Sequence, residues 1–172
     1  MPKKIISKKI FRKLREIKIL LTDVDGVLTD GGMYYTAEGL VMKKFNAKDG
    51  MGANLLRENG IKIGIISADK TPIAKKRAEV LKFDYIYFGV SKKMEALTEI
   101  IKISEVQSSE IAFIGDDVND LEVFENVGLS IAPSDAASKV LQKADFITPM
   151  GGGKGAYRYV ADLILESKSV DK

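Results

Sequence analysis

The chain has 172 residues, of which 45% are hydrophobic and 30% are charged, as expected for one soluble globular domain with a substantial core. It contains no Cys and no His, which excludes disulfides, thiolate nucleophiles, Ser-His-Asp triads and metal sites built from these residues. Proton transfer therefore falls to Asp, Glu, Lys or Tyr, and a metal site would be carboxylate-based, which favours Mg²⁺, Mn²⁺ or Ca²⁺.

The net charge of +3 comes from the start of the chain. Residues 1–16 hold seven of the 27 basic residues and one of the 24 acidic residues, so the remainder carries a net charge of −3. This balance argues against a nucleic-acid-binding domain.

No apolar run approaches the roughly 18–20 residues that span a membrane, and no signal-peptide pattern is present, so we expect a cytoplasmic protein.

Residues 1–16 are predicted to form a basic amphipathic helix. Apolar side chains recur there every three to four residues, at Ile6, Ile10, Leu14 and Ile17. We expect this face to lie against the domain with the lysines solvated. A role at a membrane surface or on nucleic acid is the alternative.

Residues 17–30 (IKILLTDVDGVLTD) organise the chain. Their apolar start predicts a strand buried on both faces of a parallel sheet, and Asp23, Asp25 and Gly26 follow it directly. Ligands of open α/β sheets sit beyond the carboxyl ends of the strands, so the pair predicts a site. The alternative is that both carboxylates cap a loop or a helix.

The remaining pattern alternates strands with helices. Residues 31–45 predict a projecting β-hairpin around a short glycine-containing loop. Predicted strands follow at 61–66, 84–88, 111–114, 128–131 and 145–147, and predicted helices end near 60, 82, 104, 126, 142 and 166. Thr71, Ser91 and Ser134 are the expected N-caps of three of these helices. The fold class is therefore α/β, a three-layer Rossmann-like core with a mainly parallel sheet.

Polar residues follow three of the predicted strands and should meet at one edge of the sheet. They are Asp23 and Asp25, Ser67, and Asp116 and Asp117, with Lys93 at the start of a nearby helix. Carboxylates, a hydroxyl and a lysine suit Mg²⁺-assisted phosphoryl transfer, in which the cation and the lysine neutralise phosphoryl oxygens. One carboxylate can attack phosphorus, and its neighbour can transfer protons.

The motifs DVDGVLT (23–29), Ser67, Lys93 and GDDVND (115–120) resemble, in chain order, those of the haloacid-dehalogenase-like phosphatase superfamily. The resemblance covers about residues 17–166. It implies Asp23 as nucleophile and Asp25 as general acid/base. It implies Mg²⁺ on Asp23, Asp116 and the backbone carbonyl of Asp25. Ser67 and Lys93 would bind the phosphoryl group, with Lys93 preferred to Lys92 by register.

Asp117 and Asp120 would support the site by orienting Lys93 and the loop. An N-cap with first-turn charge is an equally good interpretation of these two carboxylates.

The gaps between the motifs leave no room for a cap domain, so one capless domain is expected over residues 1–172. The compact length, the hairpin, FNAKDG (45–50) and GGGKGAYR (151–158) resemble the 3-deoxy-D-manno-octulosonate 8-phosphate (KDO 8-phosphate) phosphatase subfamily. That resemblance implies a phosphorylated 2-keto-3-deoxy sugar acid as substrate, in a pathway to lipopolysaccharide or a sialic-acid-like sugar. It also implies a homotetramer in which a neighbour's hairpin and tail close the site.

One departure concerns substrate choice. The subfamily commonly has Gly-Arg after the motif-two serine, whereas this chain has Ala68, Asp69 and Lys70, of which Ala68 and Lys70 are expected to line the substrate. Lys70 could meet a substrate carboxylate only as a point charge, and Asp69 would repel it. The acidic-Lys-Thr run looks more like relatives that act on nine-carbon, sialic-acid-type 9-phosphates, which is the alternative substrate class.

Two other functions compete with a phosphatase. A receiver-like signalling module also uses an acidic cluster, a hydroxyl, a lysine and Mg²⁺, but its phospho-accepting Asp lies on a mid-chain strand. A catalytically idle oligomerisation module is disfavoured by the intact set of polar residues. The glycine-rich residues 151–155 lack P-loop spacing, so a subunit contact or a plain loop is preferred to a phosphate cradle.

Overall fold

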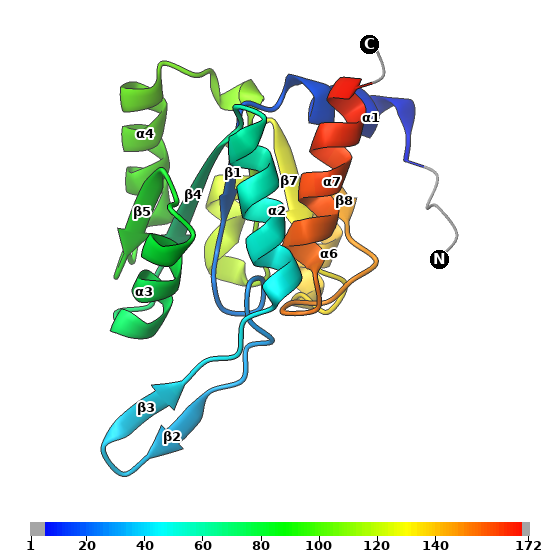
Figure 1. Ribbon diagram of the computed structural model, residues 1–172. Helices are drawn as coiled ribbons and strands as arrows, with labels where there is room; N and C mark the ends of the chain where they lie inside the picture. The colour runs from blue at the N-terminus through cyan, green and yellow to red at the C-terminus, as the bar shows by residue number, and fades with distance from the viewer. Residues whose placement is uncertain (1–5, 170–172) are drawn as a thin grey trace.

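The computed structural model describes residues 6–169, and its centre is a six-stranded parallel sheet (Figure 1). The strand order is β5-β4-β1-β6-β7-β8, so the first strand lies in the middle. Parallel pairing places the carboxyl ends of β1, β4 and β6 side by side at one edge. The strands are β1 (Ile19–Thr22), β4 (Lys62–Ser67), β5 (Tyr85–Phe88), β6 (Ile111–Ile114), β7 (Leu129–Ala132) and β8 (Phe146–Ile147).

Helices cover both faces of the sheet and enclose two hydrophobic cores, which confirms the three-layer α/β fold. One face carries α1 (Lys8–Glu16), α2 (Ala47–Glu58), α3 (Pro72–Val80) and α7 (Ala156–Ser169). The other carries α4 (Lys93–Ser104), α5 (Leu121–Phe124) and α6 (Ser138–Lys143). Two short 3₁₀ turns, η1 (Ser108–Glu110) and η2 (Val118–Asp120), flank β6.

The basic helix α1 packs beside α7, as its periodicity predicts (Figure 1). Ile10 and Leu14 are buried in the core beneath it. Lys13 donates a hydrogen bond to Asp145 at 2.8 Å, so this lysine of α1 is paired and not simply solvated. The part of the predicted helix at residues 1–5 lies outside the described residues. No helix within residues 6–169 is long and apolar enough to cross a bilayer.

The hairpin formed by β2 (Tyr34–Thr36) and β3 (Gly39–Met42) extends away from the sheet and the helices (Figure 1). The strands pair antiparallel, with a register shift between Tyr34 and Tyr35. Over residues 6–169, the segment from β1 to β4 adds only this hairpin and α2, and β4 to β6 adds only βα units. A capless core is therefore observed, as expected.

Two predicted N-caps, Ser91 and Ser134, are wrong, and tertiary contacts explain both. α4 begins at Lys93 with Lys92 as N-cap, not Ser91, because Lys93 is held by carboxylates at the sheet edge. α6 begins at Ser138, not after Ser134, because Ser134 N donates to the Met150 carbonyl at 3.0 Å and Ala137 N to the Asp116 carbonyl at 2.8 Å. These contacts hold residues 134–137 in turns.

Candidate active site

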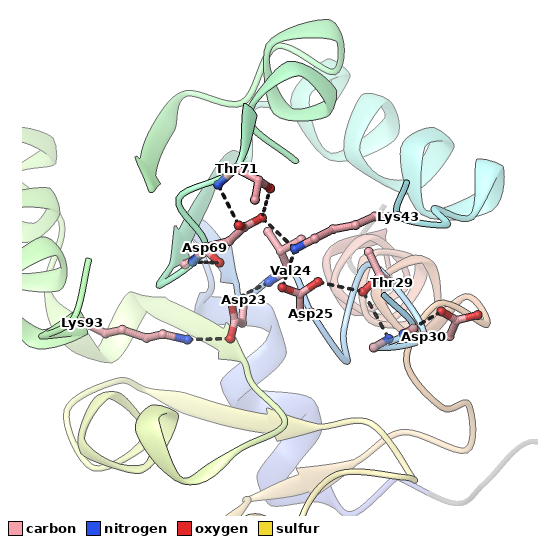
Figure 2. Close-up of polar contacts among 12 residues, drawn as sticks. Asp23, Val24, Asp25, Thr29, Asp30, Lys43, Asp69, Thr71 and Lys93 are labelled. Carbon is pink, nitrogen blue, oxygen red and sulfur yellow. Dashed lines mark hydrogen bonds and ion pairs between the residues drawn. The ribbon is translucent and has the colours of Figure 1, made fainter. Parts of the chain in front are cut away.

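Asp23 lies at the carboxyl end of β1 and is almost completely buried. Its backbone N–H donates to the Ile114 carbonyl at 2.9 Å, which continues the pairing with β6 past the end of the strand. Its Oδ1 accepts from Val24 N at 2.6 Å, and its Oδ2 accepts from Lys93 Nζ at 2.6 Å (Figure 2). The sheet and two donors therefore fix both the position and the orientation of this carboxylate.

Gly26 turns the loop after β1 and makes room for the carboxylate of Asp116. Its φ of +72° is a conformation that side-chain-bearing residues rarely adopt. A Cβ on Gly26 would lie 1.9 Å from Asp116 Oδ2. Val27, Leu28 and Thr29 then donate backbone N–H groups to the Val24 carbonyl, which closes the loop. The glycine thus allows the first loop and the loop after β6 to come together.

Of the two adjacent lysines, Lys93 is the one that lies against the carboxylates at the carboxyl end of β1. Its Nζ lies 2.6 Å from Asp23 Oδ2 and 2.6 Å from Asp120 Oδ1, and the residue is buried. Burial works against its charge, but the two carboxylates outweigh it and raise the pKa of Lys93 above its ordinary value. Lys92 lies outside the site and pairs with Glu95 at 3.6 Å.

Asp117 and Asp120, the second and third acidic residues of GDDVND, make different contacts. Asp120 is fully buried, and its Oδ2 accepts from Asp116 N at 3.0 Å and Asp117 N at 3.3 Å while Oδ1 meets Lys93. Asp120 therefore orients both Lys93 and the loop. The Asp117 carboxylate accepts from Val118 N at 2.7 Å and is the N-cap of η2, so for Asp117 the capping interpretation fits and the contact with Lys93 is not formed.

Carboxylate oxygens of Asp23, Asp116 and Asp120 lie within 4.8 Å of one another. Burial and the charges of Asp23, Asp120 and Asp117 raise the pKa of Asp116 to about 7. Both carboxylate oxygens of Asp23 and both of Asp120 already accept protein hydrogen bonds, whereas the Asp116 carboxylate accepts none from residues 6–169, so the Asp116 oxygens are the most available for a cation. Three carboxylates against one ammonium leave excess negative charge, which fits a hard divalent cation with oxygen ligands.

The residues after β4 complete the edge of the site. Ser67 is the buried last residue of β4, and its Oγ accepts from Asp69 N at 3.2 Å. Ala68 and Lys70 are exposed beside it. Asp69 is paired with its neighbours, because its Oδ2 accepts from Thr71 Oγ1 at 2.9 Å and from a lysine at 2.7 Å. The expected repulsion between Asp69 and a substrate carboxylate is therefore weakened.

That lysine is Lys43, a residue of the site that the sequence analysis missed. It follows β3, its side chain is only 1% exposed, and its Nζ lies 2.6 Å from Asp25 Oδ2 (Figure 2). Burial opposes its charge, but hydrogen bonds from Lys43 to Asp25 and Asp69 raise its pKa. Thr29 Oγ1 donates to the other Asp25 oxygen at 3.2 Å. No periodicity in the sequence distinguishes buried Lys43 from exposed Lys44. A sequence-based search could have found Lys43 only by asking which cation pairs with the loop carboxylates of Asp25 and Asp69.

A family model of haloacid dehalogenase-like hydrolases matches residues 83–159. The 3-deoxy-D-manno-octulosonate 8-phosphate phosphatase KdsC of Escherichia coli K12 is 36% identical over 160 residues, which cover 93% of this chain and 85% of that protein. The chain belongs to the haloacid dehalogenase-like hydrolase family. It is a phosphoric monoester hydrolase, and this assignment decides against a receiver-like module.

Solved structures agree with this assignment. The 3-deoxy-D-manno-octulosonate 8-phosphate phosphatase of Yersinia pestis aligns with a TM-score of 0.92 at 36% identity, over 95% of this chain and 88% of that one. The Moraxella catarrhalis enzyme, solved with magnesium, phosphate and KDO, aligns with a TM-score of 0.91 at 34% identity, over 95% and 94%. The shared core of this phosphatase family is therefore present over nearly the whole chain.

Proposed function

We propose that this enzyme is a Mg²⁺-dependent phosphatase of a phosphorylated 2-keto-3-deoxy sugar acid, most specifically KDO 8-phosphate, acting through an aspartyl phosphate. The observation that carries the proposal is the fixed carboxylate of Asp23 at the end of β1, 2.6 Å from buried Lys93 and grouped with Asp116. The relatives of known name that cover almost all of the chain supply the substrate class.

In the first half of the reaction, an Asp23 carboxylate oxygen attacks phosphorus, and the bond from phosphorus to the sugar oxygen breaks. Asp25 gives its proton to the departing sugar oxygen. Lys93 and Ser67 hold phosphoryl oxygens. Asp120 keeps Lys93 in place, since its Oδ1 lies 2.6 Å from Nζ. The product of this half is phosphorylated Asp23 and the free sugar acid.

In the second half, Asp25 takes a proton from a water molecule that attacks the phosphorus of phospho-Asp23. The bond from phosphorus to Asp23 breaks, which releases phosphate and restores the carboxylate. Asp23, Asp116 and the backbone carbonyl of Asp25 would hold Mg²⁺, which when bound neutralises charge on the phosphoryl oxygens. Within this scheme Asp117 supports the loop only through its N-cap.

A nine-carbon, sialic-acid-type 9-phosphate is the second candidate substrate. The run Asp69-Lys70-Thr71 favours it, because Lys70 is exposed beside Ser67 and offers a point charge in place of an arginine fork. The Asp69 carboxylate accepts hydrogen bonds from Lys43 and Thr71. Of the two charged side chains Asp69 and Lys70, Lys70 is therefore the one that faces solvent.

The test is Mg²⁺-dependent phosphate release from KDO 8-phosphate and from nine-carbon 9-phosphates side by side, with Asp23→Asn as the blank. We expect a strong preference for KDO 8-phosphate and no turnover by a folded Asp23→Asn variant. A preference for the nine-carbon substrates would move the assignment to the second candidate. Activity in Asp23→Asn, or equal hydrolysis of a generic aryl phosphate, would contradict the nucleophile or the substrate class, respectively.

A further inference from the structure

Three segments that are distant in the sequence meet at Lys43. Asp25 lies on the loop after β1, Asp69 lies on the loop after β4, and Lys43 follows the second strand of the hairpin. The Lys43 ammonium lies 2.6 Å from Asp25 Oδ2 and 2.7 Å from Asp69 Oδ2. Figure 2 shows the lysine reaching between the two carboxylates.

The surroundings of Lys43 make this bridge obligatory. Its side chain is 1% exposed, so water cannot replace a lost partner, and a buried ammonium must be paired. The Asp69 side chain is only 7% exposed and also accepts two hydrogen bonds from Thr71. The Asp69 carboxylate is therefore fixed in place. Because Lys43 is bound to it, Lys43 in turn restricts the position of the Asp25 carboxylate.

The carboxylate of Asp25 has two donors of unequal strength. Thr29 Oγ1 approaches Oδ1 at 3.2 Å and is neutral, whereas Lys43 Nζ approaches Oδ2 at 2.6 Å and is charged. A charge-assisted hydrogen bond is roughly twice as strong as a neutral one. Lys43 therefore does most to set the plane of the Asp25 carboxylate.

We propose that Lys43 is a positioning residue for the reaction: it holds Asp25 in the orientation that proton transfer requires, anchored through Asp69. The inference rests on the proposed function, in which Asp25 gives and takes the proton. Lys43 acts through Asp25: within residues 6–169 its ammonium pairs with Asp25 and Asp69, whereas Asp23 pairs with Lys93. Lys43 directly follows β3, so a movement of the hairpin would also change the orientation of the Asp25 carboxylate.

The first experiment compares Lys43→Met with Lys44→Met. Methionine keeps the length and apolar stem of Lys43 but removes the ammonium. We expect kcat to fall about 100-fold, the lower end of what a general acid/base contributes, with KM changed by less than about threefold. Phospho-Asp23, trapped by rapid quench, should decay correspondingly more slowly. Lys44 is exposed and pairs with Asp30 at 3.3 Å, so Lys44→Met should keep the wild-type kcat.

A double-mutant cycle separates positioning from a general structural role. If Lys43 acts through Asp25, the variant carrying both Lys43→Met and Asp25→Asn should be no slower than Asp25→Asn alone. If the losses multiply, Lys43 acts elsewhere and the inference is overturned. The same holds if Lys43→Met keeps the wild-type kcat.

Loss of the ammonium leaves the buried carboxylate of Asp69 facing the part-exposed carboxylate of Asp25, so thermal unfolding of each variant is measured first. If Lys43→Met does not fold, Lys43→Met with Asp69→Asn restores the charge balance and takes its place, with the same expected fall in kcat. A wild-type kcat in that variant overturns the inference. The proposed function fails separately: Asp23→Asn and Asp25→Asn would then hydrolyse substrate at the wild-type rate.

Discussion

Asp49 is a buried carboxylate that the catalytic scheme does not use. It lies on α2 and is 3% exposed, and its Oδ1 accepts from Arg158 N at 2.8 Å. Its Oδ2 is buried with no hydrogen-bond partner among the described residues. Burial raises its pKa from 3.8 to about 6, and the backbone hydrogen bonds from Arg158 and Gly155 reduce the effect. The folded state therefore disfavours the charged form of Asp49.

The pH dependence of stability follows from this shift. Since the folded pKa lies above the unfolded one, the unfolded chain releases this proton first, and Asp49 makes folding less favourable as pH rises from about 4 to about 6. Asp49→Asn removes this term. Between about pH 4 and pH 6, we expect the free energy of unfolding of Asp49→Asn to rise relative to that of the wild type, by up to about 3 kcal/mol. Above about pH 6 the difference should be constant. Urea unfolding at several pH values measures it; a pH-independent difference would contradict the assignment.

At the scale of elements, the glycine-rich segment 151–155 supports the first loop. Gly153 N donates to the Val27 carbonyl at 2.9 Å, and Asn46 donates to the Gly153 carbonyl at 3.1 Å. A Cβ on Gly152 would lie 2.0 Å from the Gly26 carbonyl oxygen. The segment before α7 therefore packs directly on the loop that follows Asp25, and its glycines permit the close approach of the two backbones.

This packing predicts different effects for two glycines. Gly152→Ala should push on the Gly26 carbonyl, which would lower stability by about 1–3 kcal/mol and lower kcat as well. Gly155→Ala is the matched control: its φ of +93° is strained with a side chain, but a Cβ there meets nothing within 4 Å, so kcat should be kept. Thermal unfolding and phosphate release test both. Equal kcat in the two variants would contradict a supporting role for Gly152.

At the scale of the whole molecule, we infer that the chain is one domain, because both hydrophobic cores share the one sheet. The exception is the hairpin, whose large apolar side chains are exposed. They belong to Met33, Tyr34, Tyr35, Val41 and Met42. Exposed apolar surface concentrated on one projecting element is typical of an interface, and self-association is the most common way to cover it.

We therefore predict a homo-oligomer, and the tetramer that the subfamily resemblance implies is part of this prediction. Light scattering should give a multiple of the 18.9 kDa chain mass. The double change Tyr35→Glu and Val41→Glu should shift the mass toward the monomer. Ile103→Glu, at an equally exposed aliphatic position on α4, should leave it unchanged. A wild-type mass of 18.9 kDa would contradict the prediction.

Local patterns along the chain were enough to predict the order of strands and helices, the phosphatase family and most of the polar edge of the sheet. Apolar runs such as Ile111–Ile114 identify buried strands locally, and Asp23, Ser67 and Asp116 lie at the ends of such strands or within two residues of them. Parallel topology then brings their ends to one edge, whatever the details of packing. Local patterns suffice for these features because each depends on residues adjacent in the chain.

Which charged side chains pair with one another could not be predicted from local patterns. The partnership of Lys43 with Asp25 and Asp69, the split between Asp117 as a cap and Asp120 as a partner of Lys93, and the true starts of α4 and α6 all depend on contacts between distant segments. The physical reason is desolvation. A buried lysine ammonium needs carboxylate partners at hydrogen-bond distance, and the packing of loops, which has no period in the sequence, sets which carboxylates reach it.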